Sequence, residues 1–290
     1  MIYAFLAIAF FFLQNVSNKE FARRFPSALP GLALFDGLAL SVASVALMFT
    51  GGLSVLPGGQ LWLALGFAAL FVVTVFLIVL TMATGPMGMS GLLINMSMVI
   101  PTTMGILIWR EELSLVKALG IGCMIAVLII SGLSEKGKGQ AANLKWFLLA
   151  LVTMVCNGTL SVLQKVLTSA FENPNIVSFN CVSFGIGALL CWGLALIFKL
   201  RGADLTPWTK GKKALALCAA GMGLGTVGGN LLNTLALTVL PASVSFPLVQ
   251  GTVIVALLLG SALLYKERLN RAGYLSVALG LAGIVLLSLA

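Results

Sequence analysis

The sequence has little charge and no histidine. Only 9% of its 290 residues are Asp, Glu, Lys or Arg, whereas a water-soluble domain carries about a quarter. Hydrophobic residues make up 60% of the chain, and the mean hydropathy is +1.12. Such a chain lacks the polar residues to cover a hydrophobic core. We therefore expect an integral membrane protein whose solvent is the lipid bilayer.

Two further absences limit the chemistry. Without histidine, the chain lacks the commonest general base and metal ligand. The cysteines all lie inside apolar segments and form no Cys-x-x-Cys pair, so we interpret them as packing residues: Cys123, Cys156, Cys181, Cys191 and Cys218. With no nucleophile–base pair and no set of ligands, we expect no enzyme activity, no cofactor and no metal. A membrane enzyme is the alternative that these absences oppose.

Ten apolar segments with short connections make up nearly the whole chain. A helix needs about 20 residues to cross the hydrocarbon, and helices satisfy their own backbone hydrogen bonds there. The sequence therefore predicts an all-α membrane protein with ten transmembrane helices, at residues 2–17, 30–50, 61–81, 86–108, 114–133, 144–165, 176–198, 214–238, 241–264 and 272–290.

The basic residues are distributed unevenly between the two sides of these segments. The loops after the odd-numbered segments and their flanks hold all of the 17 Lys and Arg except Arg110, Lys117 and Lys165. Cytoplasmic loops collect Lys and Arg, so the pattern predicts that both termini lie outside the cytoplasm. The same loops account for the net charge of +9. Because no basic stripe with interleaved aromatics occurs, we expect no nucleic-acid partner.

The second half of the chain repeats features of the first. The fourth and ninth segments match at an offset of 155 residues, pairing Pro86 with Pro241, Ser90 with Ser245, Asn95 with Gln250, and Gly105 with Gly260. Phe35-Asp36 similarly matches Phe179-Asn180, and Lys19 matches Lys165. Chance similarity between apolar helices is the alternative. Because five spans are an odd number, the second copy enters the membrane from the other side. We therefore predict two inverted five-helix repeats, residues 1–135 and 140–290.

These features resemble the drug/metabolite transporter superfamily, and its EamA-like family most closely. The resemblance rests on the ten spans, the five-plus-five repeat and an acidic step after the fourth and ninth spans, Glu111-Glu112-Leu113 and Glu267-Arg268-Leu269. The sequence departs from the family pattern where Arg110 and Lys266 replace the usual glycine before the acidic residue, and the first span lacks a Trp-Gly pair. The resemblance implies a secondary carrier of small metabolites or drugs that works without ATP.

Asp36 is the acidic residue farthest inside an apolar span. A carboxylate there costs several kcal/mol unless it is protonated, paired or facing water. One interpretation is a carboxylate that couples transport to protons or binds a cation. The alternatives are a position near the interface, since Pro30 starts the helix about two turns earlier, or a structural ion pair with Lys19 or Arg24.

Amide side chains form a second group of candidates for substrate binding, at Asn15, Asn95, Asn157, Asn180, Asn230, Asn233 and Gln250. Amides facing lipid would leave donors and acceptors unmet, so they must face protein or water. Taken one by one, they are more typical of hydrogen bonds that join helices. As a set, they predict one polar cavity near the middle of the membrane, between the halves.

Two other patterns concern the packing and the ends of helices. Gly221, Gly225 and Gly229 form a G-x-x-x-G-x-x-x-G face that lets another helix approach closely. Glu111 and Glu267 end spans beside basic residues. A salt-bridge cluster that fixes helix ends is the favoured interpretation there, and gating is the alternative.

The function expected from these patterns is secondary transport of a small metabolite or drug-like solute by alternating access. Coupling of this transport to protons is one option. A passive channel or a structural membrane subunit is the alternative, although no charge ring or filter loop indicates a pore. We expect a monomeric, multi-pass protein of a bacterial inner membrane.

Overall fold

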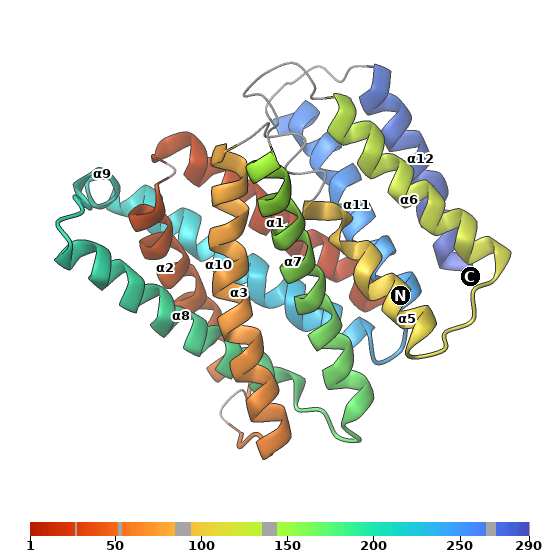
Figure 1. Cartoon of the computed structure of the whole chain (residues 1–290), viewed down its shortest axis with the longest axis horizontal. Coiled ribbons are helices and arrows are strands. Elements are labelled where there is room, and N and C mark those ends of the chain that lie inside the picture. Colours follow the sequence, from red (N-terminus) through yellow and green to blue (C-terminus); the bar gives the residue numbers. More distant parts are fainter. Residues whose placement is uncertain (27, 52–53, 85–93, 135–143, 265–270, 290) are drawn as a thin grey trace.

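The computed structural model describes all residues except 27, 52–53, 85–93, 135–143, 265–270 and 290, and every regular element in the described part is a helix (Figure 1). The helices are α1 (Ile2–Arg24), α2 (Leu29–Met48), α3 (Gly58–Thr84), the 3-10 turn η1 (Met96–Met98), α5 (Val99–Leu107), α6 (Leu115–Ser134), α7 (Leu144–Ala170), α8 (Ile176–Leu200), α9 (Thr206–Thr209), α10 (Lys212–Ala236), α11 (Ala242–Leu264) and α12 (Arg271–Leu289).

Five helices within the described residues are long and apolar enough to cross a membrane: Leu29–Met48, Gly58–Thr81, Leu144–Ala170, Ile176–Leu200 and Lys212–Ala236. Shorter apolar helices occupy parts of the predicted spans at 86–108, 114–133, 241–264 and 272–290. The all-helical character and the multi-pass membrane class are therefore confirmed, while the full set of ten spans stays a prediction.

Several predicted boundaries differ from the structure, including that of α7, which continues to Ala170 instead of ending at residue 165. Helix α1 continues to Arg24 instead of ending at residue 17, and Glu20 pairs there with Arg23 and Arg24 at 3.2 and 3.0 Å. Ion pairs between residues three and four positions apart stabilise a helix, which suits the continuation of α1 beyond residue 17. The predicted span 86–108 begins outside the described residues, and in its described part η1 precedes α5.

Helices from the two halves of the chain pack together in antiparallel pairs. Helix α1 lies along α10, α2 along α8, α3 along α7, and α6 along α12. In the α2–α8 pair, the Ser44 hydroxyl donates to the Cys181 carbonyl at 3.1 Å, and Trp192 Nε1 donates to Ser41 Oγ at 3.0 Å. The bundle is therefore held together mainly by contacts between distant parts of the sequence.

The predicted glycine face of α10 packs against α1. A Cβ on Gly225 would lie 2.6 Å from the backbone nitrogen of Gln14 and 2.7 Å from the carbonyl oxygen of Phe10. A Cβ on Gly221 or Gly229 would instead meet the side chain of Ser17 or Phe11 at under 3 Å. The two backbones therefore approach more closely than any side chain would allow. Close packing of this kind drives helix association in lipid, where the hydrophobic effect is absent.

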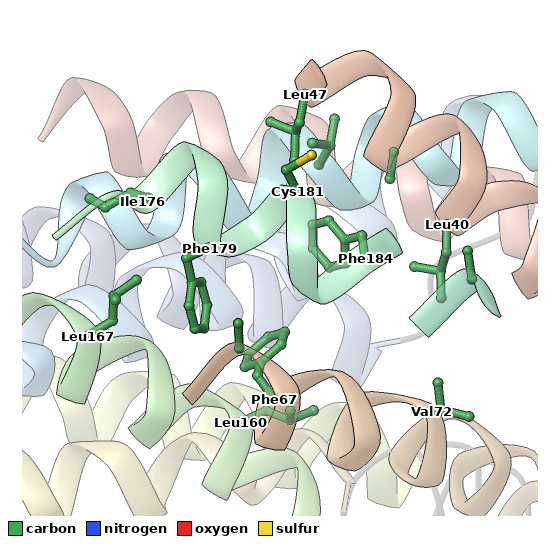
Figure 2. Close-up of a cluster of buried hydrophobic side chains, with 14 of the residues drawn as sticks. Leu40, Leu47, Phe67, Val72, Leu160, Leu167, Ile176, Phe179, Cys181 and Phe184 are labelled. Atoms are coloured by element: carbon green, nitrogen blue, oxygen red, sulfur yellow. The ribbon is translucent and has the colours of Figure 1, made fainter. Parts of the chain in front are cut away.

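A hydrophobic core lies where α3 and α8 meet, with α2 and α7 beside them. Figure 2 shows Phe67 of α3 below Phe179 of α8, and their ring centroids are 5.5 Å apart in an edge-on arrangement. Phe71 and Phe184 pack in the same edge-on way at 5.8 Å. Edge-to-face pairs suit the ring quadrupole. This apolar contact joins α3 of the first half to α8 of the second.

Candidate functional site

Gln164 on α7 connects two of the predicted amides on α10. Its Nε2 donates to Asn230 Oδ1 at 2.8 Å, and its Oε1 accepts from Asn233 Nδ2 at 2.9 Å. Asn230 and Asn233 share a helix face, as their spacing predicts. Asn233 is buried, and its Oδ1 has no hydrogen-bond partner. This arrangement holds two amide side chains in fixed orientation and leaves one acceptor oxygen available.

The network continues from α10 to α1. Asn230 Nδ2 donates to the Thr226 carbonyl at 2.9 Å, and Gln14 Nε2 of α1 donates to Thr226 Oγ1 at 2.9 Å. Thr226, Asn230 and Asn233 lie at positions i, i+4 and i+7 of α10, so one face of that helix carries them. The amide network formed by Gln14, Gln164, Thr226, Asn230 and Asn233 therefore joins a helix of the first half to two helices of the second.

Asn157 makes a separate contact two turns earlier on α7. Its Nδ2 donates to Ser97 Oγ of η1 at 2.7 Å, and Ser97 is fully buried. The adjacent Gly158 packs against Ile100 and the Ser97 carbonyl. Asn157 and Gln164 are seven residues apart and share a face of α7. That face therefore carries polar contacts to both η1 and α10.

Four predicted amides lie outside the contacts described so far. Asn15 Nδ2 donates to the Phe11 carbonyl of its own helix at 2.8 Å, and Asn180 Nδ2 donates to the Ile176 carbonyl at 2.8 Å. Asn95 is exposed at the start of η1, and Gln250 is half-buried on α11. The single cavity lined by all seven amides stays a prediction.

A cavity of about 250 Å³ lies between α5, α6 and α11, and its lining is mainly apolar, including Met98, Ile121, Ile125 and Pro247. None of the seven amides lines it. Because its walls offer few polar groups, this cavity provides no substitute for the amide network as a polar site.

Asp36 is buried in α2, which packs against α8 and α10. Its Oδ2 has no hydrogen-bond partner, and no ion pair within the described part of the chain reaches it. The alternative ion pair with Arg24 is wrong, because the Arg24 guanidinium binds Glu20 instead. Among the described residues Asp36 therefore has no counter-ion, an expensive position for a buried carboxylate that favours a functional interpretation.

The repeat mates Asp36 and Asn180 lie apart along the α2–α8 pair. Ser44, eight residues beyond Asp36, contacts Cys181, whereas Gly37 faces Trp192. At 1.5 Å per residue, roughly 12 Å of helix separates the Asp36 level from the Asn180 level. Because α2 and α8 are antiparallel, the Asp36 carboxyl group and the Asn180 amide therefore lie near opposite ends of the α2–α8 contact.

Glu111 lies between α5 and α6 and contacts the second half of the chain. Its Oε1 and Oε2 accept from the backbone N–H groups of Ala242 and Ser243 at 2.7 and 2.8 Å, at the start of α11. Lys165 Nζ lies 3.3 Å from Oε1. Burial raises the pKa of Glu111, but hydrogen bonds from Ser243 and Ala242 and the charge of Lys165 outweigh it, so the pKa lies below its usual value.

The sequence interpretation missed Gln14 and Gln164. Both residues lie near the ends of the predicted first and sixth spans, where polar residues are common and carry little information. The signal available was that Gln164 lies seven residues after Asn157, on the same helix face. Lys165 was noted as a repeat mate of Lys19 and in the count of basic residues, but not as a partner of Glu111, which lies 54 positions away in the sequence.

Comparisons with known proteins agree with the helical, multi-pass architecture. The family model of the EamA-like transporter family matches residues 144–289. One protein crystal structure is similar to this chain with a TM-score of 0.75 and 15% sequence identity, and the match covers 99% of this chain and 96% of that one. In all, 28 chains of known structure match. No curated protein matches the sequence. The match to the family model spans half of the chain, and the protein therefore belongs to the EamA-like transporter family.

Proposed function

We propose that the protein is a secondary active transporter that moves a small solute by alternating access between two inverted five-helix halves. The observation that carries this proposal is the pattern of helix contacts. Exchanging the halves turns α1–α10 into α7–α3, α10–α2 into α3–α8, and α1–α11 into α7–α5, and contacts of all these kinds occur. The α2–α8 and α6–α12 contacts map onto themselves. This supports a pseudo-two-fold axis.

The halves correspond to residues 1–135 and 140–290, with α9 as an extra turn in the second. Five spans in each half would require the second to be inverted, as in many secondary transporters. Two halves of this kind can rock about a site between them and expose it to each side in turn. The four principal antiparallel pairs all join one half to the other, which suits this motion.

The amide network is the favoured part of the substrate site. It draws on α1 of the first half and on α7 and α10 of the second, so movement of the halves would change its shape. Neutral donors and acceptors suit a small neutral or zwitterionic solute with polar groups of its own. Asn157, Asn15, Asn95, Asn180 and Gln250 stay predicted contributors to the same site.

Asp36 is proposed as the group that couples transport to protons. The unpartnered Oδ2 in apolar surroundings supports this role, because a carboxyl group without a counter-ion gains most from binding a proton. Helix α2 contacts both α8 and α10, so protonation of Asp36 would change the charge at the contact between the two halves.

We propose the orientation of the chain in the membrane from the positions of its basic side chains, most of which lie at one end of the bundle. Basic side chains lie at the ends of α1, α8 and α9 and at the starts of α7, α10 and α12: Lys19, Arg23, Arg24, Lys145, Lys199, Arg201, Lys210, Lys212, Lys213 and Arg271. Arg110 follows α5, Lys117 lies at the start of α6 and Lys165 lies near the end of α7, and Figure 1 marks both termini beside α5 and α6. The positive-inside rule then supports termini outside the cytoplasm.

Counterflow in proteoliposomes tests the proposed function. A thermal-shift screen of a panel of small metabolites first identifies a solute that raises the melting temperature. Vesicles loaded with that solute unlabelled are then diluted into a trace of the labelled form. In a carrier, each unlabelled solute that leaves the vesicle brings the binding site to the outside, where it binds labelled solute and carries it in. The label therefore accumulates transiently above its equilibrium level. Label that only equilibrates would favour the alternative, a passive channel.

A further inference from the structure

Glu111 forms a compact set of bonds from the first half of the chain to two helices of the second half. Its carboxylate accepts from the Ala242 and Ser243 amides of α11 and pairs with Lys165 of α7. The helix start contributes partial positive charge to the same carboxylate. Three positively polarised groups therefore converge on one side chain.

The turn after α5 aims Glu111 at these partners. The Glu111 backbone N–H donates to the Gly105 carbonyl at 3.2 Å, and Arg110 takes a left-handed conformation with φ of +52°. A Cβ on Gly105 would lie 2.7 Å from Glu111 Oε2 and 3.2 Å from the Ser243 nitrogen. Gly105 therefore leaves the space through which the carboxylate reaches α11.

These contacts are nearly dry. The exposed fractions of the Glu111 and Lys165 side chains are 9% and 12%, and Lys165 Nζ lies 6.0 Å from the centre of the Trp109 ring. By contrast, the neighbouring Glu112 is exposed. Charges buried in this way interact strongly with their partners and poorly tolerate losing them. The bonds of Glu111 to its partners are therefore either all formed or, once this end opens, all replaced by bonds to water.

We propose that Glu111, with Lys165 and the first amides of α11, is the latch of the gate at the end of the bundle that carries the termini. This inference rests on the proposed alternating access. Opening this end moves the first half away from α7 and α11, and that movement breaks every bond of the latch. The bonds of the latch are formed in the structure, so this conformation is assigned to the state in which this end is closed.

Distances between spin labels at both ends test the latch without any substrate. The five cysteines are replaced by alanine, and the protein is placed in nanodiscs. Leu113→Cys with Glu172→Cys reports the latch end, and Ala22→Cys with Lys145→Cys reports the other end. Each pair joins the two halves through exposed positions. Pulsed electron paramagnetic resonance then compares the parent protein with Glu111→Gln, Lys165→Gln and the matched control Glu112→Gln.

In Glu111→Gln, the ratio of long to short distances at the latch end should rise about tenfold, since bonds to charged groups are the stronger ones. In the same variant, the distance between the two labels at the other end should become shorter. Both distances in Glu112→Gln should match those in the parent. Unchanged distances with a lower melting temperature would show a purely structural cap and overturn the proposal, as would an equal shift in Glu112→Gln. A reciprocal shift supports the latch even if counterflow fails, and that failure would then reject transport alone.

Discussion

Asn233 and Gln164 are joined by a hydrogen bond of 2.9 Å between two helices, and Gln164 uses its other amide atom to hold Asn230. Gln164→Leu keeps the side-chain size and removes the partner of Asn230 Oδ1 and of Asn233 Nδ2. We expect a loss of about 1–2 kcal/mol of stability, the range for polar contacts between membrane helices, and a weaker thermal shift with the solute found by screening. Thermal unfolding followed by tryptophan fluorescence measures both.

Asn15→Leu is the matched control for this prediction. Within the part of the chain that the structure describes, Asn15 bonds only a carbonyl of its own helix, so its loss should lower the melting temperature less than Gln164→Leu does. Equal losses in the two variants would contradict a special role for the network.

Asp36→Asn should separate binding from proton coupling. The amide keeps the size of the protonated carboxyl group and resembles the repeat mate Asn180, but it cannot release a proton. We expect the variant to bind solute and exchange it in counterflow, yet to lose uphill uptake driven by a pH gradient. Vesicles with and without an imposed gradient provide the measurement. Uphill uptake at the parent level in Asp36→Asn would remove Asp36 from the mechanism and leave Glu20 or uncoupled transport.

Gly225→Ala tests the close approach of α1 and α10. The new Cβ would meet backbone atoms of Gln14 and Phe10 at under 3 Å, and backbone cannot rotate away as a side chain can. We expect a loss of about 1–3 kcal/mol, as for overpacked cores. Gly122→Ala is the control, since its Cβ would meet nothing within 4 Å and alanine is the better helix former. Similar melting temperatures for the two variants would refute the packing argument.

Arg110 occupies a position that favours glycine, because its φ is +52°. The left-handed conformation costs an ordinary residue roughly 1–2 kcal/mol, and a β-branched residue more. We therefore expect Arg110→Gly to melt at or above the parent temperature and Arg110→Val to melt below it. Melting curves in detergent decide this. A more stable valine variant would mean that the turn is not strained.

The termini should lie outside the cytoplasm. A reporter enzyme that is active only in the cytoplasm, fused after Ala290, should give little signal, and one that is active only outside should give a strong signal. Fusions after Lys199 should behave in the opposite way, because that residue lies at the basic end of the bundle. A strong cytoplasmic signal from the fusion after Ala290 would reverse the orientation and leave the fold unchanged.

Composition and periodicity were enough to predict the class of fold, because lipid allows few alternatives to the helix. The glycine face of α10 was also predictable, since Gly221, Gly225 and Gly229 need no knowledge of their partner. What the sequence did not reveal were the partners themselves. Lys165 looked like the end of a span, and only the antiparallel packing of distant helices brings it to Glu111. Gln164 was missed for the same reason, because its contacts with α10 span more than 60 residues.

The pairing of α1 with α10 also bears on how the protein is made. Helix α1 ends at residue 24, and α10 begins at residue 212. At about 5–20 residues per second, the ribosome delivers α10 roughly 10–40 s after α1 has entered the membrane. During that interval Gln14 lacks its Thr226 partner, and the groove that will receive the glycine face is open to lipid. We therefore expect α1, although it is made first, to become fixed in the bundle only after α10 has been made.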